Sequence, residues 1–172
     1  MEFLNSIKDL IPDYAKDIRL NIDGTIARSS LAPNEAVGVA LAAAFAAKSK
    51  PIIELLRASE ALAPEEVQGA LTAAALMGMN NVWYPYVEMT EDADIKGSPA
   101  GLRMNAYATH GGVDKRRFEM YALGASIIGK CDFCVRSHFD NLKKEGLSTQ
   151  QLRDIGRIAA TINAAAQVIA AE

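Results

Sequence analysis

One short segment holds both cysteines of the chain and one of its two histidines: Cys131-Asp132-Phe133-Cys134-Val135-Arg136-Ser137-His138. In a helix, Cys131 and Cys134 lie at i and i+3, and His138 follows Cys134 at i+4, so all three share one face. A dithiol beside an imidazole is the set of groups that thiol redox chemistry requires. One thiolate attacks, the second thiol resolves the product, and the imidazole moves the proton.

The sequence leaves open which of the two thiols is the more acidic. Gly129 is expected to end one helix, with Cys131 in the first turn of the next, where free amides and the helix dipole favour a thiolate. That argument favours Cys131. His138 lies one helical turn from Cys134 and favours that residue instead.

Glu119 is predicted to face His138. If Gly129 and Lys130 form the turn of an antiparallel helical hairpin, residues equidistant from the turn lie opposite each other; Glu119 is ten positions before Gly129 and His138 nine after it. Glu119 also lies in a strongly apolar stretch, where a buried acid needs a partner. The carboxylate is therefore placed to orient His138 as a base, and a purely structural ion pair is the alternative.

Composition favours closely packed helices in a single domain spanning residues 1–172. The chain is 50% hydrophobic but only 6% aromatic, and 172 residues can bury a core without disulfide staples. A net charge of −3 gives no indication of binding to nucleic acid or to an anionic membrane.

The chain is also predicted to be soluble and cytoplasmic. Its first residues carry an acid where a secretory signal would carry lysine or arginine. The longest apolar stretch, Val37 to Ala47, is shorter than the ~20 residues that span a bilayer. In a reducing cytosol, a Cys-x-x-Cys pair is more often catalytic or metal-binding than structural.

Helical periodicity runs from end to end, and no strand pattern of useful length interrupts it, which predicts an all-α fold. Asn34, Asp114 and Ser148 are candidate helix caps. An apolar stripe with helical spacing runs from Phe3 to Ile18, and Pro12 is expected to interrupt it. Residues 91–99 are expected to be the least structured segment. Helices are expected over about 34–50, 51–62, 64–79, 100–110, 114–129, 130–144 and 149–171.

A weak internal repeat relates two stretches at a separation of 51 residues, roughly 60–90 and 113–145. Residues 75–80 match residues 126–131 in pattern. Two similar helical units, of which only the second carries chemistry, would explain this; chance similarity between alanine-rich helices is the alternative. Asn80, Trp83 and Gln68 then stand where Cys131, Cys134 and Glu119 stand later.

The chemical residues also carry a family resemblance. Glu119, eleven intervening residues, Cys131-x-x-Cys134, three residues and His138 resemble the signature of AhpD-type alkylhydroperoxidases, within the carboxymuconolactone decarboxylase-like superfamily. The resemblance covers essentially the whole chain. Further segments similar to the family are Pro12-Asp13-Tyr14-Ala15-Lys16-Asp17-Ile18, Met77-Gly78-Met79-Asn80-Asn81-Val82 and Gly101-Leu102-Arg103-Met104-Asn105.

The resemblance implies an AhpD-like helical protomer with an internal duplication, assembled as a homotrimer, that reduces organic hydroperoxides to alcohols. Cys134 would attack the peroxide and become a sulfenic acid. Cys131 would supply a proton and close the redox-active Cys131–Cys134 disulfide. His138 and Glu119 would form the proton relay with a water molecule, and no bound cofactor or metal is implied.

The resemblance also implies thiol partners. Dihydrolipoamide on a lipoylated 2-oxoacid dehydrogenase component would reopen the disulfide, and an AhpC-type peroxiredoxin could receive electrons through a mixed disulfide at Cys134. Some family members carry a histidine directly before the second cysteine, where this chain has Phe133. Proton handling by that extra histidine is therefore absent here, which bears on rate and pH dependence.

Other interpretations of the same residues are open. The cysteines could be two small buried hydrophobes, or zinc ligands with a fourth ligand from His110 or Glu119, although three ligands along one helix suit tetrahedral zinc poorly. His110 itself is predicted to be a helix-end residue without a catalytic role. Met77, Met79 and Trp83 are expected in the core or at a subunit interface.

Two other functions compete with a direct peroxidase. The chain could be an electron adaptor that regenerates a peroxiredoxin, which needs the dithiol but depends less on His138 and Glu119. It could instead be a non-redox lactone decarboxylase or a structural module. The dithiol argues against a non-redox function, because decarboxylation has no use for a Cys-x-x-Cys pair.

Overall fold

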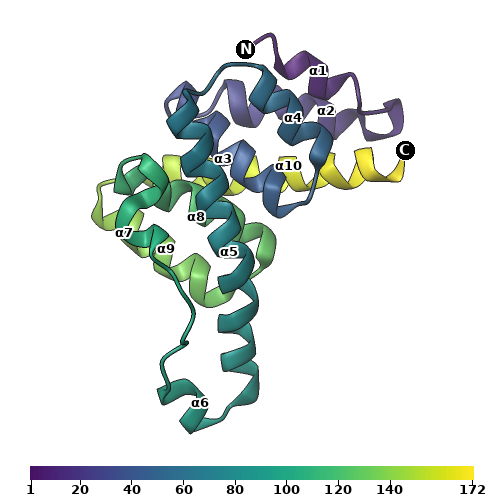
Figure 1. The fold of residues 1–172 in the computed structure, drawn as a ribbon. Helices are drawn as coiled ribbons and strands as arrows, with labels where there is room; N and C mark the ends of the chain where they lie inside the picture. The colour runs from purple at the N-terminus through teal and green to yellow at the C-terminus, as the bar shows by residue number, and fades with distance from the viewer.

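The computed structural model describes residues 1–172 as helices joined by turns and loops, which confirms the all-α prediction (Figure 1). A helix with the length and apolar character to cross a bilayer is not found among them. The elements are α1 (Leu4–Lys8), the 3-10 turn η1 (Asp13–Ala15), α2 (Lys16–Ile22), the π turn η2 (Asp23–Ala27), α3 (Pro33–Ala46), α4 (Lys50–Ala58), α5 (Pro64–Thr90), α6 (Ala93–Gly97), α7 (Ala106–Thr109), the 3-10 turn η3 (His110–Gly112), α8 (Lys115–Gly129), α9 (Asp132–Lys144) and α10 (Thr149–Ala171).

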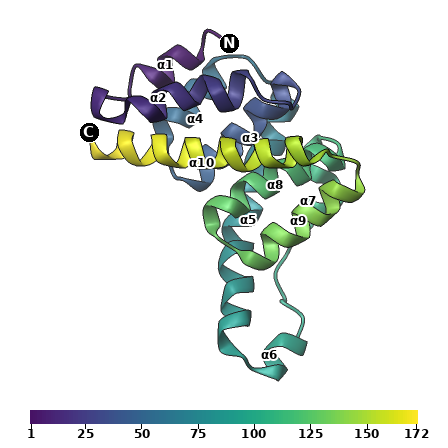
Figure 2. The same ribbon diagram turned by 180° about the vertical axis from the view of Figure 1, so that it is seen from behind.

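The core is built around α3, whose residues 35–44 are all buried. This helix packs against α5, α8 and α10. Small side chains allow helix backbones to approach one another closely while the interior stays densely packed, which accounts for the alanine-rich composition. α10 runs across the back of the body, where it packs against α2 on the N-terminal side and against α8 and α9 (Figure 2).

Gly38 on α3 gives a direct test of this packing, because a Cβ there would stand 2.3 Å from Cε1 of the buried Tyr121 ring. We expect Gly38→Ala to lower the free energy of unfolding in urea by about 1–3 kcal/mol, the usual effect of overpacking. Gly156→Ala on α10 is the matched control, because nothing lies within 4 Å of its added methyl group. That variant should gain up to about 1 kcal/mol in helix propensity; equal stability of the two would contradict the packing.

α5 is the longest helix, and its C-terminal part extends away from the body as an arm that α6 closes (Figure 1). The sequence predicted an end near Met79, which is wrong: the helix continues through Pro85 to Thr90. An internal proline costs about 3 kcal/mol, but contacts hold this region. Tyr84 stacks on Phe133 with ring centroids 4.4 Å apart, and α6 packs back against α5.

The predicted helical hairpin is formed by α8 and α9. Asp114 caps α8 by accepting the Arg117 backbone N–H, and α8 ends at Gly129. Lys130 then takes a left-handed conformation with φ of 53°, which turns the chain back so that α9 packs on α8. In the predicted internal repeat, Gly78 corresponds to Gly129, but α5 runs unbroken through Gly78 and forms no matching turn there. The internal repeat therefore stays a prediction.

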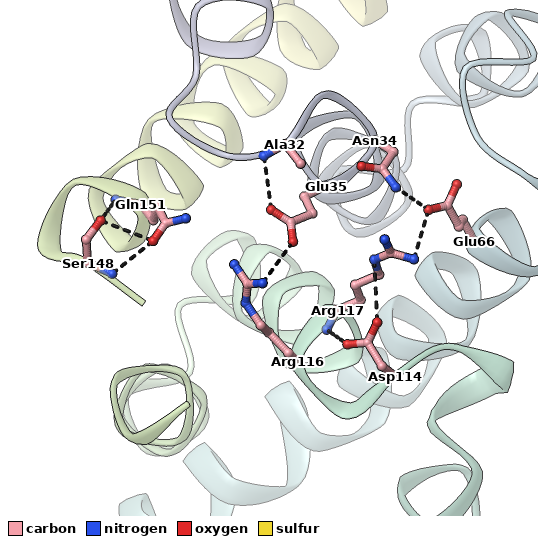
Figure 3. A network of polar contacts seen from close by, with 9 residues as sticks. All are labelled: Ala32, Asn34, Glu35, Glu66, Asp114, Arg116, Arg117, Ser148 and Gln151. Atoms are coloured by element: carbon pink, nitrogen blue, oxygen red, sulfur yellow. Dashed lines mark hydrogen bonds and ion pairs between the residues drawn. The ribbon is translucent and has the colours of Figure 1, made fainter. Parts of the chain in front are cut away.

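Ion pairs between partly exposed arginines and buried glutamates connect the first turn of α8 to α3 and α5 (Figure 3). Arg116 Nη1 lies 3.4 Å from Glu35 Oε1 on α3, and Arg117 Nη1 lies 3.2 Å from Glu66 Oε1 on α5. Both carboxylates are buried, and each also accepts a backbone N–H at the start of its own helix. Because a buried charge requires such partners, the network sets the position of α8 and thereby of Glu119.

Further predicted boundaries differ from the structure, and the helices expected over 34–50 and 51–62 end at Ala46 and Ala58. Asn34 is not a cap: α3 begins at Pro33, and the Asn34 side chain instead donates to Glu66 across the network. The helix predicted over 100–110 is reduced to α7, because Gly101 has a left-handed φ of 64° that an α-helix does not accommodate.

The N-terminal apolar stripe is only partly a core stripe. Leu4, Ile7 and Ile11 are buried, but Leu10 and Tyr14 are exposed. The chain between α1 and η1 is not helical, so the spacing of 3.6 residues does not continue across the break.

Candidate active site

Cys131 and Cys134 form a disulfide at the start of α9, with Cα atoms 5.2 Å apart. Cys131 is the N-cap residue, and its Sγ accepts a hydrogen bond of 3.2 Å from the Cys134 backbone N–H. That N–H is one of the donors left free at a helix N-terminus. Together with the helix dipole, it stabilises negative charge on the Cys131 sulfur once the disulfide opens.

The Glu119 carboxylate contacts His138, as the hairpin geometry predicted. Glu119 Oε2 lies 2.6 Å from His138 Nδ1, and Asn141 Nδ2 donates to Oε1 over 3.2 Å. Both the acid and the imidazole are buried. Because each carboxylate oxygen has a partner, the acid is held in place and fixes the orientation of the ring; turning the ring over would put a carbon against Oε2.

Met77 on α5 contacts the other ring nitrogen of His138. Its Sδ lies 3.2 Å from Nε2. A thioether sulfur accepts but carries no hydrogen, so this contact is a hydrogen bond only when Nε2 is protonated. In the disulfide form the two ring nitrogens of His138 therefore face Glu119 and Met77, and a water molecule is the group that would carry a proton between the imidazole and a cysteine sulfur.

A cavity of about 330 Å³ lies beside these groups. Cys134 lines it, whereas Cys131 does not and is completely buried. The sulfur that a small molecule in the cavity can reach is therefore that of Cys134. The full set of lining residues is Asn80, Tyr84, Met104, Tyr107, Glu119, Phe133, Cys134, Ser137, His138 and Asn141.

Aromatic rings form much of the cavity wall. The Tyr107 ring stacks on the imidazole of His138 with centroids 6.4 Å apart and planes 15° from parallel. Burial, together with the nearby negative charge of Glu119, raises the pKa of Tyr107 to about 12. Its phenol is therefore protonated throughout the neutral range and can donate a hydrogen bond into the cavity.

The structure brings all four predicted residues, Cys131, Cys134, His138 and Glu119, to one place, although Cys131 stands just behind the cavity wall. His110 lies elsewhere, as the C-cap of α7 with its ring 5.7 Å from that of Phe118. No group of three or more His, Cys, Asp and Glu side chains is arranged to hold a metal ion.

The sequence reasoning missed four residues of the site: Met77, Asn80, Tyr107 and Asn141. Asn141 follows His138 at i+3, so helical spacing could have placed it on the same face. Asn80 lies in a segment already noted for its family likeness. Met77 was expected in the core or at a subunit interface and is buried. Nothing in the sequence indicated its contact with His138, or that Tyr107, in the helix predicted over 100–110, would reach the site.

Comparison with known proteins identifies the family. A family model described as carboxymuconolactone decarboxylase family matches residues 94–172, which contain the α8–α9 hairpin. Alkyl hydroperoxide reductase AhpD of Rhodospirillum centenum is 40% identical over 171 residues, 98% of this chain and 91% of that protein. The chain belongs to the AhpD family.

Two other AhpD proteins show the same extent of similarity. The alkyl hydroperoxide reductase AhpD of Coxiella burnetii is 39% identical over 170 residues, 96% of each chain. That of Maricaulis maris is 39% identical over 171 residues, 98% of each chain. The likeness to AhpD proteins thus includes α5, which supplies Met77 and Asn80 and lies before the residues that the family model matches.

Proposed function

We propose that this chain is a cytoplasmic thiol-dependent peroxidase that reduces organic hydroperoxides to alcohols in antioxidant defence. The observation that carries the proposal is the Cys134 sulfur at the wall of a cavity of about 330 Å³, beside the buried His138–Glu119 pair. The relatives named alkyl hydroperoxide reductase support the substrate class.

In the oxidative half of the proposed cycle, the Cys134 thiolate attacks the terminal oxygen of ROOH. An S–O bond forms as the O–O bond breaks, which yields a sulfenic acid on Cys134 and RO⁻. The alkoxide takes up a proton through His138, Glu119 and a water molecule. The Cys131 thiol then attacks the Cys134 sulfur, its own proton leaves with the hydroxyl group as water, and the disulfide closes; the two cysteines have supplied two electrons.

In the reductive half, a dithiol reopens the disulfide, and dihydrolipoamide is the proposed reductant. Its thiolate attacks Cys134, the sulfur that lines the cavity, and Cys131 leaves as a thiolate that the Cys134 N–H stabilises. The second thiol of the reductant then displaces Cys134. We place the dithiol on a lipoylated 2-oxoacid dehydrogenase component and the chain in a homotrimer. The proposed cycle uses thiols alone, without a bound cofactor or metal.

Thiol stoichiometry tests the oxidative half without any reductant. The fully reduced protein, treated with one equivalent of cumene hydroperoxide, should lose two thiols and release one equivalent of the alcohol. Thiol titration and chromatography of the alcohol measure both quantities. Loss of thiols without alcohol formation, or alcohol formation with both thiols intact, would contradict the proposed chemistry.

A second candidate function, an electron adaptor for an AhpC-type peroxiredoxin, is favoured by one further observation. A groove of about 570 Å³ between the α5 arm and α9 shares Phe133 and Ser137 with the site cavity. A folded partner could rest there while one of its cysteines reaches Cys134. In a Cys131→Ser protein, a mixed disulfide between Cys134 and the peroxiredoxin should accumulate on a non-reducing gel; failure to reduce any peroxiredoxin would count against this role.

A further inference from the structure

Asn80 is a buried polar residue that the proposed cycle does not use. It comes from α5, is only 2% exposed and lines the cavity that Cys134 and His138 also line. Its Oδ1 is closed to solvent and has no hydrogen-bond partner in the protein, so Asn80 acts toward the cavity through its amide nitrogen.

The Asn80 amide nitrogen binds a second residue of the cavity wall. Asn80 Nδ2 donates to the hydroxyl oxygen of Tyr107 over 3.5 Å. Because that oxygen accepts from Asn80 and bonds to no other protein group, the hydroxyl hydrogen of Tyr107 remains free to donate. Asn80 therefore orients the Tyr107 hydroxyl as a donor in the cavity where the Cys134 sulfur lies.

A hydroperoxide ROOH matches this donor, because its alkoxy oxygen accepts a hydrogen bond. We propose that Tyr107 binds and activates the hydroperoxide by donating its hydroxyl hydrogen to the alkoxy oxygen, and that Asn80 positions that hydroxyl. This assignment rests on the proposed peroxidase function and names one residue that contacts the substrate and one that orients it.

The Tyr107 hydroxyl favours cleavage of the O–O bond of the hydroperoxide. When the Cys134 thiolate attacks the terminal oxygen, the sulfur gives up two electrons, the S–O bond forms and the O–O bond breaks. The negative charge moves to the alkoxy oxygen, where the Tyr107 hydroxyl stabilises it before the relay protonates it. A donor fixed at the position where charge develops lowers the barrier directly.

The test measures the rate at which stopped-flow mixing with a peroxide oxidises the reduced protein, for two peroxides with different leaving groups. Tert-butyl hydroperoxide releases a basic alkoxide, and peracetic acid releases acetate, which needs little stabilisation. Tyr107→Phe should slow the reaction with tert-butyl hydroperoxide about 10²-fold, the usual effect of losing one such donor, and slow the reaction with peracetic acid much less. Equal losses with both peroxides, or no loss, would overturn the assignment to Tyr107.

Asn80→Leu gives a second readout. Because Asn80 positions the Tyr107 hydroxyl, the variant should lose about tenfold with tert-butyl hydroperoxide, as for one neutral hydrogen bond, and less with peracetic acid. An unchanged rate with tert-butyl hydroperoxide, or equal losses with both peroxides, would overturn the assignment to Asn80. Tyr86→Phe, on the exposed arm of α5, is the control and should react as the wild type does.

A wild-type protein that reacts with tert-butyl hydroperoxide no faster than a free thiol would remove the proposed function itself. A fast wild type with an equally fast Tyr107→Phe variant would remove the assignment to Tyr107 alone. The rate at which dihydrolipoamide opens the disulfide should stay at the wild-type value in Tyr107→Phe and Asn80→Leu, because that step includes no O–O cleavage. A parallel fall in that rate would instead show general damage to the site and contradict the proposal.

Discussion

Cys134→Ser is expected to abolish peroxide consumption. Cys134 presents the sulfur that lines the cavity, whereas Cys131 is completely buried behind it. A serine hydroxyl neither ionises at neutral pH nor accepts an oxygen atom from a peroxide, so it cannot replace the thiolate. The measurement is loss of tert-butyl hydroperoxide over time with excess dithiol present.

Cys131→Ser is the matched control, measured without the dithiol, because a dithiol would itself reduce a sulfenic acid. It keeps the attacking sulfur and removes only the resolving one, so it should consume about one equivalent of peroxide rapidly and leave a sulfenic acid on Cys134. A dimedone adduct at Cys134, located by mass spectrometry, would identify that species. Full peroxide turnover by Cys134→Ser would contradict the assignment of the nucleophile.

Loss of the Glu119–His138 pair is expected to have the next largest effect. Glu119→Gln or His138→Gln should lower the rate constant for peroxide reduction by ~10²–10⁴, the range typical of a lost proton-transfer group. In Glu119→Gln, the amide oxygen can still accept from His138 Nδ1, which lies 2.6 Å from the carboxylate in the wild type. The ring thus stays in place while the charge that supports its protonation is removed.

Steady-state kinetics over a range of pH measures this effect, and circular dichroism confirms that each variant is folded. His110→Gln is the control, because His110 lies at the end of α7 outside the cavity and should keep the wild-type rate. Folded Glu119→Gln and His138→Gln proteins with rates within twofold of the wild type would exclude a role for this pair in proton transfer.

The hairpin that carries these residues could be predicted because its signals are local. Asp114 and Gly129 mark the two ends of α8, and the spacing of Glu119 and His138 about the turn at Lys130 places them face to face. The all-α fold could be predicted for the same reason, since helical periodicity is a property of each segment by itself.

The parts that could not be predicted depend on contacts between distant segments. Pro85 normally indicates a helix end, and only packing of α6 and Phe133 against α5 explains why the helix continues. Met77 lies 61 positions from His138 in the sequence, so no local pattern could indicate their contact. Asn80 and Tyr107 likewise meet only because α5 and α7 pack together.

We propose that the Cys131–Cys134 pair turns over as a peroxidase with a dithiol as its electron source. The first measurement is the consumption of cumene hydroperoxide by the purified protein with dihydrolipoamide as the only reductant. We expect many turnovers per protein molecule and none in Cys134→Ser. Absence of turnover by the wild type, under conditions in which dihydrolipoamide opens the Cys131–Cys134 disulfide, would contradict the proposal.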